Sequence, residues 1–339
     1  MAKEAILLIN LGSPDNPTPG KVRSYLSQFL NDRRVIDINP VGRFFLVNFV
    51  IVPFRSFASS KLYQKIWTDK GSPLITYTEE LKEKLQALVG QNVLVEMAMR
   101  YKKPSIESAL EKIRVKNPAC IHVLPLYPQY ASSSTGSSIE NLLCSIRKWE
   151  VFPKLIIHSN FYNHPAYLKA IIENGQKFNH NDFDYVVFSY HGLPERQILK
   201  ASAHYGKNSC SLSNCCDQIT ETNNFCYRAN CFATTRELVK ALNIPENKYV
   251  TSFQSRLDNK WLKPYSDKVI EELAKEGKKN ILVFSPAFVA DCLETIHEIE
   301  TEYLEIFQEH GGEKLTLVPS LNSGDNWVKA IQSIIYDKN

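Results

Sequence analysis

The sequence predicts an α/β protein with two doubly wound halves, each built on a parallel sheet of about four strands. The first observation is that short apolar segments alternate with stretches of helical periodicity. The second is that 339 residues with 44% hydrophobic content are enough for two globular halves of similar size. We place the halves at residues 1–160 and 161–339.

Strands are expected where short apolar runs are rich in residues that favour β structure. In chain order they are residues 4–10, 93–99, 119–126, 154–159, 185–189, 248–253, 280–284 and 314–318. Helical periodicity between them predicts helices at residues 78–89, 105–115, 139–146, 167–178, 233–242 and 267–276. In such parallel sheets ligands bind outside the carboxyl ends of the strands, so the residues that follow each strand are the first site candidates.

Charge, cysteine distribution and the N-terminus exclude several classes of protein. The formal net charge of +4 is too small for a nucleic-acid binder that depends on a broad basic face. The apolar stretch at residues 5–11 is too short for a secretory signal. Cys120, Cys144 and Cys292 are scattered singly, unlike a secreted disulfide framework. We therefore expect a reducing, cytoplasmic compartment.

The longest apolar run covers residues 41–54 and is interrupted by Arg43 and Pro53. A run of this length is too short to span a bilayer, which needs roughly 20 apolar residues. Two interpretations stay open. One is a buried helix. The other is an apolar lip that touches a membrane, where Arg43, Arg55 and Lys61 would meet anionic headgroups.

Polar and aromatic residues follow several expected strands. Arg100 and Tyr101 come after residues 93–99, and Gln129 and Tyr130 come after residues 119–126. These four side chains are therefore candidates for contact with a ligand.

Two further strand ends carry chemically specific residues. The hydroxyl run at residues 132–138 is either a linker or, because it precedes a helix, a binding site for a carboxylate or phosphate. His191 comes two residues after the strand expected at residues 185–189 and is followed by Gly192. A histidine in this position is either a functional residue or a satisfied core or surface side chain.

Three glutamates, Glu294, Glu298 and Glu302, recur every four residues after the strand at residues 280–284. An α-helix would place all three along one stripe, where like charges destabilise it by a few tenths of a kcal/mol per pair. No Lys or Arg stands within this helix to compensate. The stripe is either a solvated helix face or a path for protons or a metal ion.

A cysteine-rich segment lies near residues 205–231, with the spacing Cys210-x4-Cys215-Cys216-x9-Cys226-x4-Cys231. This density indicates a metal site, and four thiolates suit tetrahedral zinc or an iron–sulfur cluster. The spacing matches neither the usual zinc knuckles nor the common ferredoxin pattern, so the residues alone leave the metal open. One cysteine is spare, and Cys215 competes with Cys216 for the fourth position.

Motifs along nearly the whole chain resemble the ferrochelatase family, in the family's order: LLINLGSPD, AMRY, YPQYASSSTGSS, FSYHGLPER, FQSR, WLKPY and FVADCLETIHEIETEY. The resemblance implies the chelatase fold, two Rossmann-like halves with a porphyrin cleft between them. It also implies a lyase of haem biosynthesis that inserts Fe²⁺ into protoporphyrin IX, forming protohaem with release of two protons.

The resemblance also implies roles for individual residues. His191 and Glu294 are expected to face each other across the porphyrin centre and to bind the iron or its displaced protons, with Glu298 and Glu302 relaying charge to solvent. Phe288 and Trp261 are expected as flat apolar walls, together with the tyrosines among the expected substrate-binding residues, which are Ser72, Arg100, Tyr101, Gln129 and Tyr130.

Three other positions bear on the substrate and the metal that the resemblance implies. Leu11 stands where one branch of the family has Tyr, which favours protoporphyrin IX over coproporphyrin III. Cys292 stands where many relatives have His, and direct metal contact by its thiol is the less favoured reading. Arg55 is a candidate for propionate contact.

Some ferrochelatases carry a [2Fe–2S] cluster, and this favours a structural cluster on four of the five cysteines over zinc or free thiols. Two other functions stay open: a chelatase for another tetrapyrrole or metal, and a non-catalytic haem or metal carrier. The sequence also leaves open a homodimer, a peripheral contact at the inner face of the membrane, and the iron donor.

Overall fold

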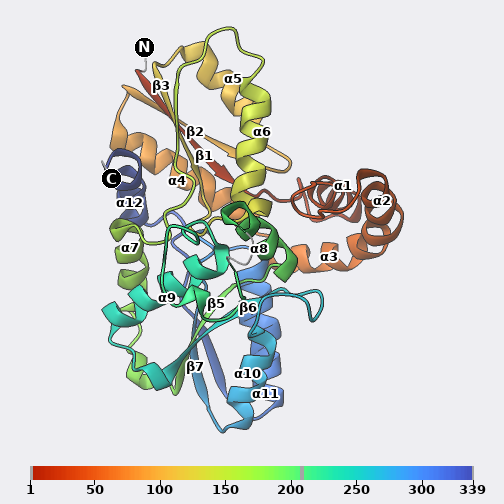
Figure 1. The fold of residues 1–339 in the computed structure, drawn as a ribbon, viewed down its shortest axis with the longest axis vertical. Helices are drawn as coiled ribbons and strands as arrows, with labels where there is room; N and C mark the ends of the chain where they lie inside the picture. Colours follow the sequence, from red (N-terminus) through yellow and green to blue (C-terminus); the bar gives the residue numbers. More distant parts are fainter. Residues whose placement is uncertain (1–2, 207–209, 338–339) are drawn as a thin grey trace. The chain divides into compact units, whose positions relative to one another are not determined.

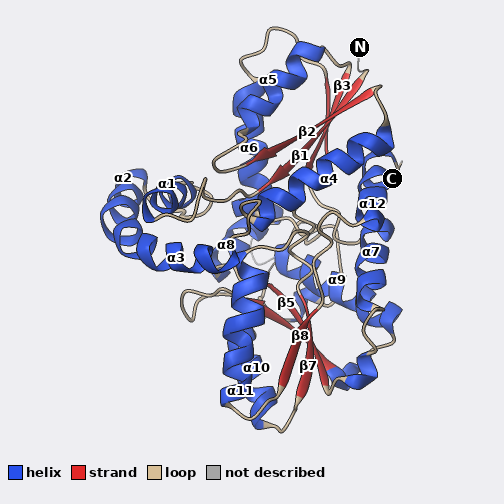
Figure 2. Ribbon diagram, turned by 180° about the vertical axis from the view of Figure 1, so that it is seen from behind, coloured by secondary structure: helices blue, strands red, loops and turns tan. Residues whose placement is uncertain are grey.

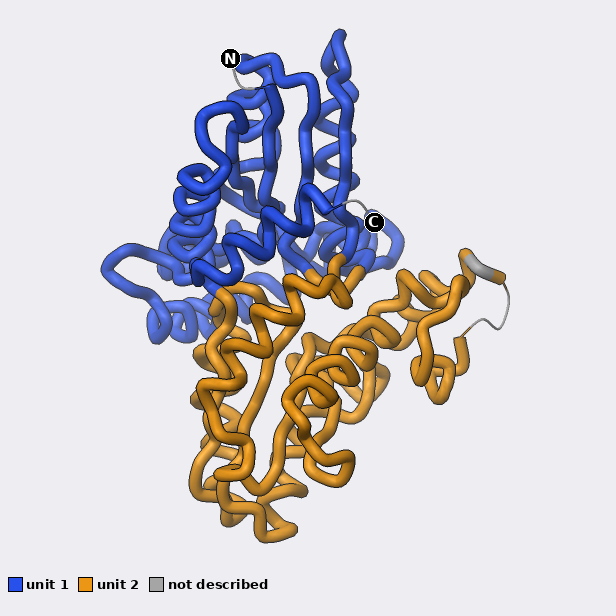
Figure 3. Tube along the Cα trace, turned by 90° about the vertical axis from the view of Figure 1, so that its left-hand side faces the viewer, with its two compact units in different colours: residues 1–127, 131–160, 322–339 blue, residues 128–130, 161–321 orange. Residues whose placement is uncertain are grey.

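The computed structural model describes residues 3–206 and 210–337. The chain forms two compact units (Figure 3). Unit 1 comprises residues 1–127, 131–160 and 322–339, and unit 2 comprises residues 128–130 and 161–321. Residues 322–339 therefore belong to unit 1, although the predicted boundary placed them in the C-terminal half. Their helix α12 (Asp325–Tyr336) packs against α4 (Pro73–Val89) of unit 1, where Lys84 donates a hydrogen bond to Asp325 at 2.8 Å.

The sheet of unit 1 is parallel, with strand order β2-β1-β3-β4. Its strands are β1 (Glu4–Asn10), β2 (Val93–Met99), β3 (Cys120–Pro125) and β4 (Lys154–Ile157). The helices α5 (Ile106–Lys116) and α6 (Ser137–Ile146) cover one face, where Leu7 and Val123 are fully buried. Figures 1 and 2 show α4 and α12 over the other face.

Unit 2 repeats this architecture with strand order β6-β5-β7-β8, again parallel. Its strands are β5 (Tyr185–His191), β6 (Tyr249–Gln254), β7 (Asn280–Phe284) and β8 (Lys314–Leu317). The helix α10 (Ser266–Lys275), the π-helix η7 (Glu294–Tyr303) and α11 (Leu304–Glu309) cover one face. The helices α7 (Pro165–Gly175) and α9 (Tyr227–Leu242) lie on the other (Figure 1).

All the expected strands are present, and each end lies within two residues of its prediction. The expected helices are present too, although α9 begins six residues earlier than residue 233. The helices without a sequence prediction are α1 (Pro19–Leu30), α8 (Glu195–Ser202), α11 and α12. The α/β fold class with two doubly wound parallel sheets is confirmed.

The apolar run at residues 41–54 forms part of an exposed arm of unit 1. The helix is continuous through α2 (Pro40–Phe45), the π-helical turn η1 (Leu46–Ile51) and α3 (Val52–Ile66). It packs against α1, and Ser27 donates a hydrogen bond to Asn48 at 2.7 Å. The buried-helix interpretation is therefore wrong, because Phe54 is 78% exposed and Phe49 is 64% exposed.

The helical arm is also longer than the apolar run suggested. By length and composition, Pro40–Ile66 is long and apolar enough to cross a membrane, and 17% of its apolar window is buried. The expectation that the run is too short to span a bilayer does not hold for the whole helix.

Candidate active site

His191 lies at the carboxyl end of β5, as expected for a site residue in a parallel sheet. Its ring is half-buried, and the ring centroids of Trp261 and Phe288 lie 6.5 and 6.2 Å away. Glycine is required at position 192, because a Cβ there would stand 2.7 Å from the backbone oxygen of Gln254. The local backbone therefore presents one imidazole between two aromatic side chains.

The His191 ring has a fixed orientation. Its Nδ1 lies 2.6 Å from the carbonyl oxygen of Gly192, which can only accept a hydrogen bond. The proton of a neutral imidazole therefore sits on Nδ1, and Nε2 keeps its lone pair. The hydroxyl of Tyr227 also donates to the carbonyl oxygen of His191 at 2.8 Å, which ties this strand end to α9.

The three glutamates lie on the π-helix η7, whose hydrogen bonds run from residue i to i+5. Residues five apart therefore face each other: Tyr303 donates to Glu298 at 2.9 Å, and His297 lies 3.2 Å from Glu302. The stripe has no Lys or Arg partner within the helix, as expected, but Glu302 contacts a buried histidine of its own helix.

Glu298 is held by four hydrogen bonds. Besides Tyr303, the donors are Gln254 Nε2 at 3.1 Å, the Ser255 backbone N–H at 2.7 Å and the Ser255 hydroxyl at 2.5 Å. Burial and the Glu298 charge raise the pKa of Tyr303, so its hydroxyl remains a donor. This geometry makes Glu298 an anchor between β6 and η7.

Cys292 precedes the π-helix and is buried, with its backbone N–H bonded to the Thr295 hydroxyl at 2.9 Å. Burial and the neighbouring Glu294 carboxylate raise the pKa of this thiol well above its usual range. Direct metal contact by Cys292 stays the less favoured prediction of the sequence.

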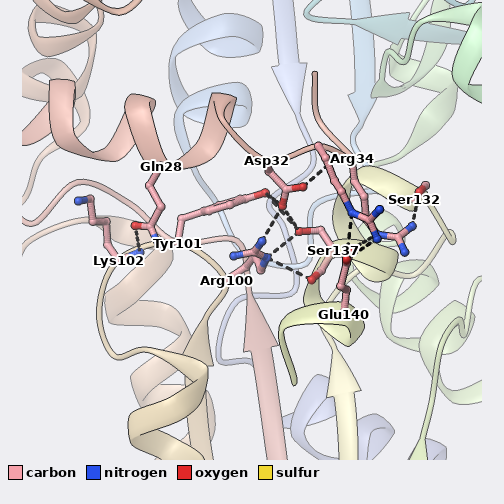
Figure 4. Close-up of polar contacts among 10 residues, drawn as sticks. Gln28, Asp32, Arg34, Arg100, Tyr101, Lys102, Ser132, Ser137 and Glu140 are labelled. Atoms are coloured by element: carbon pink, nitrogen blue, oxygen red, sulfur yellow. Dashed lines mark hydrogen bonds and ion pairs between the residues drawn. The ribbon is translucent and has the colours of Figure 1, made fainter. Parts of the chain in front are cut away.

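Arg100 and Tyr101 lie in a polar network of unit 1 (Figure 4). The carboxylate of Asp32 accepts from Arg100 Nη2 at 2.6 Å, from the Tyr101 hydroxyl at 2.9 Å and from Ser137 Oγ at 2.5 Å. Burial alone would raise the pKa of Asp32, but hydrogen bonds from Ser137 and the Arg34 backbone, together with the Arg100 charge, lower it.

The contacts within this network limit which of the expected roles Arg100 and Tyr101 can have. Tyr101 is 0% exposed, so its ring is a core side chain and does not form the expected apolar wall. The guanidinium of Arg100 forms an ion pair with Asp32 and a 2.6 Å hydrogen bond to Ser137. Its contact with a substrate stays a prediction. The hydroxyl run is not a linker, because Ser132–Gly136 forms a π-helical turn that continues into α6.

The remaining expected substrate residues are divided between the two units. Ser72 is buried at the N-cap of α4 in unit 1. Gln129 is buried in unit 2, where its amide donates to the Thr234 hydroxyl at 3.1 Å. The ring of Tyr130 packs edge-on against Phe225 at 5.5 Å. Contact of Ser72, Gln129 and Tyr130 with the substrate therefore stays a prediction.

The five cysteines of the Cys-rich segment are free thiols. The sulfurs of Cys210 and Cys215, and those of Cys215 and Cys216, are 4.0 Å apart. A hydrogen bond from Cys216 lowers the pKa of Cys226, while the same bond and burial raise the pKa of Cys216. Cys231 is fully buried within α9.

Within residues 3–206 and 210–337, no group of three or more His, Cys, Asp or Glu side chains is placed to hold a metal ion. The neighbouring thiols nevertheless have a suitable separation, because two thiolates with 2.3 Å bonds to one tetrahedral metal lie about 3.8 Å apart. Residues 207–209 lie outside the described part of the chain.

Sequence reasoning missed the side chains that support this site. Gln254 and Ser255 stand in the FQSR motif, at and just after the end of β6, but no role was predicted for either. Tyr303 ends the FVADCLETIHEIETEY motif, and no role follows for it from the sequence. Gln254 and Ser255 could have been singled out by their position at the end of a strand. The contact of Tyr303 with Glu298 depends on the π-helical register.

The comparisons with known proteins agree with this architecture. The family model described as Ferrochelatase matches residues 3–339. A ferrochelatase of Coxiella burnetii (strain Dugway 5J108-111) is 43% identical over 332 residues, which cover 97% of this chain and 92% of that protein. A ferrochelatase of Legionella pneumophila (strain Lens) is 42% identical over 337 residues, which cover 99% of each chain.

Two solved structures share the fold at 12% identity. SirB from Bacillus subtilis with Fe³⁺ has a TM-score of 0.57 and covers 98% of this chain and 96% of its own. The sirohydrochlorin chelatase SirB from Bacillus subtilis subspecies spizizenii in complex with cobalt has a TM-score of 0.55, with 98% and 94% covered. The family match over residues 3–339 and the identity with these two ferrochelatases show that the chain belongs to the ferrochelatase family, the lyases of haem biosynthesis that insert Fe²⁺ into protoporphyrin.

Proposed function

We propose that His191 and Glu294 carry out the metallation step on protoporphyrin IX. Two pyrrolic N–H protons must leave the ring as Fe²⁺ enters it, so the site needs a proton acceptor and a group that holds the ion. The observation that carries the proposal is the fixed His191 ring: Nδ1 is committed to the Gly192 carbonyl, and Nε2 remains available as base or iron ligand.

Glu294 is the carboxylate of the stripe best suited to the iron or to a displaced proton. Glu298 is committed to four donors, and Glu302 is paired with His297. Carboxylate oxygen suits a hard, water-bearing divalent ion. Among the three glutamates, Glu294 therefore has the carboxylate with the fewest competing contacts to basic or hydroxyl groups.

A turnover assay tests this function. The purified protein is expected to convert protoporphyrin IX and Fe²⁺ to haem, seen as replacement of the free-porphyrin absorption bands. A competition between Fe²⁺ and Co²⁺ separates this activity from that of a chelatase for another metal. Haem binding without turnover would instead indicate a carrier and would contradict the proposal.

We propose that Cys210, Cys215, Cys216 and Cys226 hold a [2Fe–2S] cluster. Cys231 is then the spare thiol, whereas the sequence predicted Cys215 or Cys216 as the spare. The 4.0 Å separations between the sulfurs of Cys210, Cys215 and Cys216 support this choice, as does the hydrogen bond between Cys216 and Cys226. Cys231, the spare thiol in this arrangement, is fully buried within α9. When bound, the cluster would act as a structural crosslink, since metallation transfers no electron.

The proposed cluster would be connected to the active site through α9. Cys226 is the N-cap of α9, and the next residue, Tyr227, donates to the His191 carbonyl at 2.8 Å. Holding Cys226 in place would therefore hold the strand end that carries His191.

Substitution of Cys216 by serine is expected to remove the visible absorption of the cluster and to lower the content of protein-bound iron from two per chain. Cys231→Ser is expected to keep both. Iron analysis and absorption spectra of the two purified variants make the measurement, with Cys144→Ser on α6 as a control far along the sequence. A colourless wild-type protein with stoichiometric zinc would refute the cluster and favour the zinc site.

We propose that the arm Pro40–Ile66 binds peripherally to anionic lipid at the cytoplasmic face of a membrane. Phe44, Phe49 and Phe54 are exposed by 53%, 64% and 78%, which is costly in water. The exposed Arg55 lies among them and suits phosphate headgroups. Asn48 packs on α1 through the Ser27 hydroxyl, which supports a helix that lies on a surface rather than one that spans it.

Wild-type protein is expected to float with vesicles that contain anionic lipid, and less so at high salt. The triple variant Phe44→Ser/Phe49→Ser/Phe54→Ser should bind at least about tenfold more weakly, since burying one Phe side chain contributes about 1.5–3 kcal/mol. Phe152→Ser is the matched control, because Phe152 is 62% exposed outside the arm. An equal loss in Phe152→Ser, or no flotation of the wild type, would contradict membrane binding.

A further inference from the structure

One buried amide, that of Gln254, connects the strand that carries His191 with the helix that carries Glu294. Gln254 ends β6 and is 1% exposed. It lies opposite His191 in the parallel register of β5 and β6. Its backbone oxygen accepts from the Gly192 N–H at 2.8 Å, directly beyond His191.

Both the oxygen and the nitrogen of the Gln254 side-chain amide form hydrogen bonds. Its Oε1 accepts from the hydroxyls of Ser189 at 2.8 Å and Ser285 at 3.4 Å. Its Nε2 donates to the backbone oxygen of Glu294 at 2.9 Å and to the carboxylate of Glu298 at 3.1 Å. Since an amide has one accepting end and one donating end, this set of partners fixes its orientation.

Glu298 reinforces the connection from the other side. Its carboxylate also accepts from the backbone N–H and the hydroxyl of Ser255, the residue after Gln254. Ser255 adopts a φ of 61°, in the left-handed region that a non-glycine residue occupies at a cost. The strained turn aims two donors at one carboxylate and so fastens the end of β6 to η7.

We infer that Gln254 is a positioning residue that sets the separation between His191 and Glu294. The inference rests on the proposed roles of these two residues. A strand and a π-helix share no backbone hydrogen-bond ladder, so a side chain must define how the start of η7 stands against the end of β5. A displacement of reacting groups by about 1 Å can lower a rate by roughly 100-fold.

The Gln254→Glu variant tests the inference with a side chain of equal size. It places a carboxylate oxygen against the Glu294 carbonyl and the Glu298 carboxylate, where the wild type has a donor. We expect kcat to fall about 10- to 100-fold while KM for protoporphyrin is unchanged. The double variant Gln254→Glu/Glu298→Gln restores a donor–acceptor pair at this contact and should recover at least about tenfold in kcat.

A smaller change keeps the test available if Gln254→Glu does not fold in a thermal-unfolding measurement. Ser189→Ala removes one partner of the accepting end and should lower kcat severalfold at constant KM. Thr251→Val is its matched control, because Thr251 is a buried hydroxyl residue on the same strand as Gln254, and strand alternation places it on the opposite face of the sheet. Wild-type kcat is expected in this control.

Several outcomes would overturn the inference. They are wild-type kcat in folded Gln254→Glu or in Ser189→Ala, no recovery in the double variant, and an equal loss in Thr251→Val and Ser189→Ala. Wild-type activity of His191→Ala and Glu294→Gln would instead remove the proposed roles of those residues. Loss of activity in those two variants, with full activity in Gln254→Glu, would remove the positioning role alone.

Discussion

Replacing His191 with alanine is expected to lower kcat for iron insertion by about 100- to 10,000-fold, the range that a positioned general base contributes. The imidazole lies at the end of β5, and because its Nδ1 faces the Gly192 carbonyl oxygen, Nε2 is the nitrogen that can act as base. The imidazole bonds to the carbonyl oxygen of the adjacent residue, Gly192, so replacing the ring is expected to leave the fold intact. Protoporphyrin binding, followed by fluorescence quenching, is expected to persist while metallation is measured by absorption.

The control for this variant is His180→Ala, which alters another histidine of unit 2, in the short 3-10 helix His180–Asp182. It is expected to keep wild-type kcat. Turnover at the wild-type rate in His191→Ala would show that neither base catalysis nor iron binding depends on this imidazole.

The second large effect is expected for Glu294→Gln, which keeps the size of the side chain and removes its charge. We expect kcat to fall by at least about 100-fold, because the amide can neither accept a proton near neutral pH nor neutralise a divalent ion. The structural contact of Glu294 with Gln254 is made by its backbone oxygen, so the substitution leaves it intact. Steady-state kinetics with varied Fe²⁺ would separate weaker iron capture from slower insertion.

Glu305→Gln is the matched control, since Glu305 lies on α11, which continues from the same helix, and its side chain is exposed. The comparison with Glu298→Gln is also informative. Loss of thermal stability in Glu298→Gln, together with a smaller loss of kcat than in Glu294→Gln, is expected if Glu298 is an anchor. Wild-type kcat in Glu294→Gln would contradict its proposed role.

The strands and the position of His191 followed from the sequence because the signals for them are local. A strand buried on both faces must be apolar along its length, as in β1, where Ala5–Ile9 are all 0% exposed. The carboxyl ends of parallel strands lie at one edge, so a histidine followed by a glycine at such an end could be singled out before any coordinates.

The sequence did not indicate that η7 is a π-helix. A spacing of four between Glu294, Glu298 and Glu302 suits an α-helix, and nothing local in the sequence marks a π-helix. The contacts of Glu298 with Ser255 and Tyr303 exist only when β6 and η7 are packed together. Tertiary packing thus changed a uniform acidic stripe into one anchored, one paired and one available carboxylate.

The sequence by itself determined the two-sheet architecture, the family and the residues at the strand ends, because periodicity and motif spacing are written along the chain. Only the tertiary structure decided that the phenylalanines of residues 41–54 are exposed, that Tyr101 is a core side chain, and that Gln254 joins the His191 and Glu294 segments. These features depend on which surfaces meet, and Gln254 contacts Glu294 across 40 positions of sequence. Local periodicity does not encode a contact between side chains that folding alone brings together.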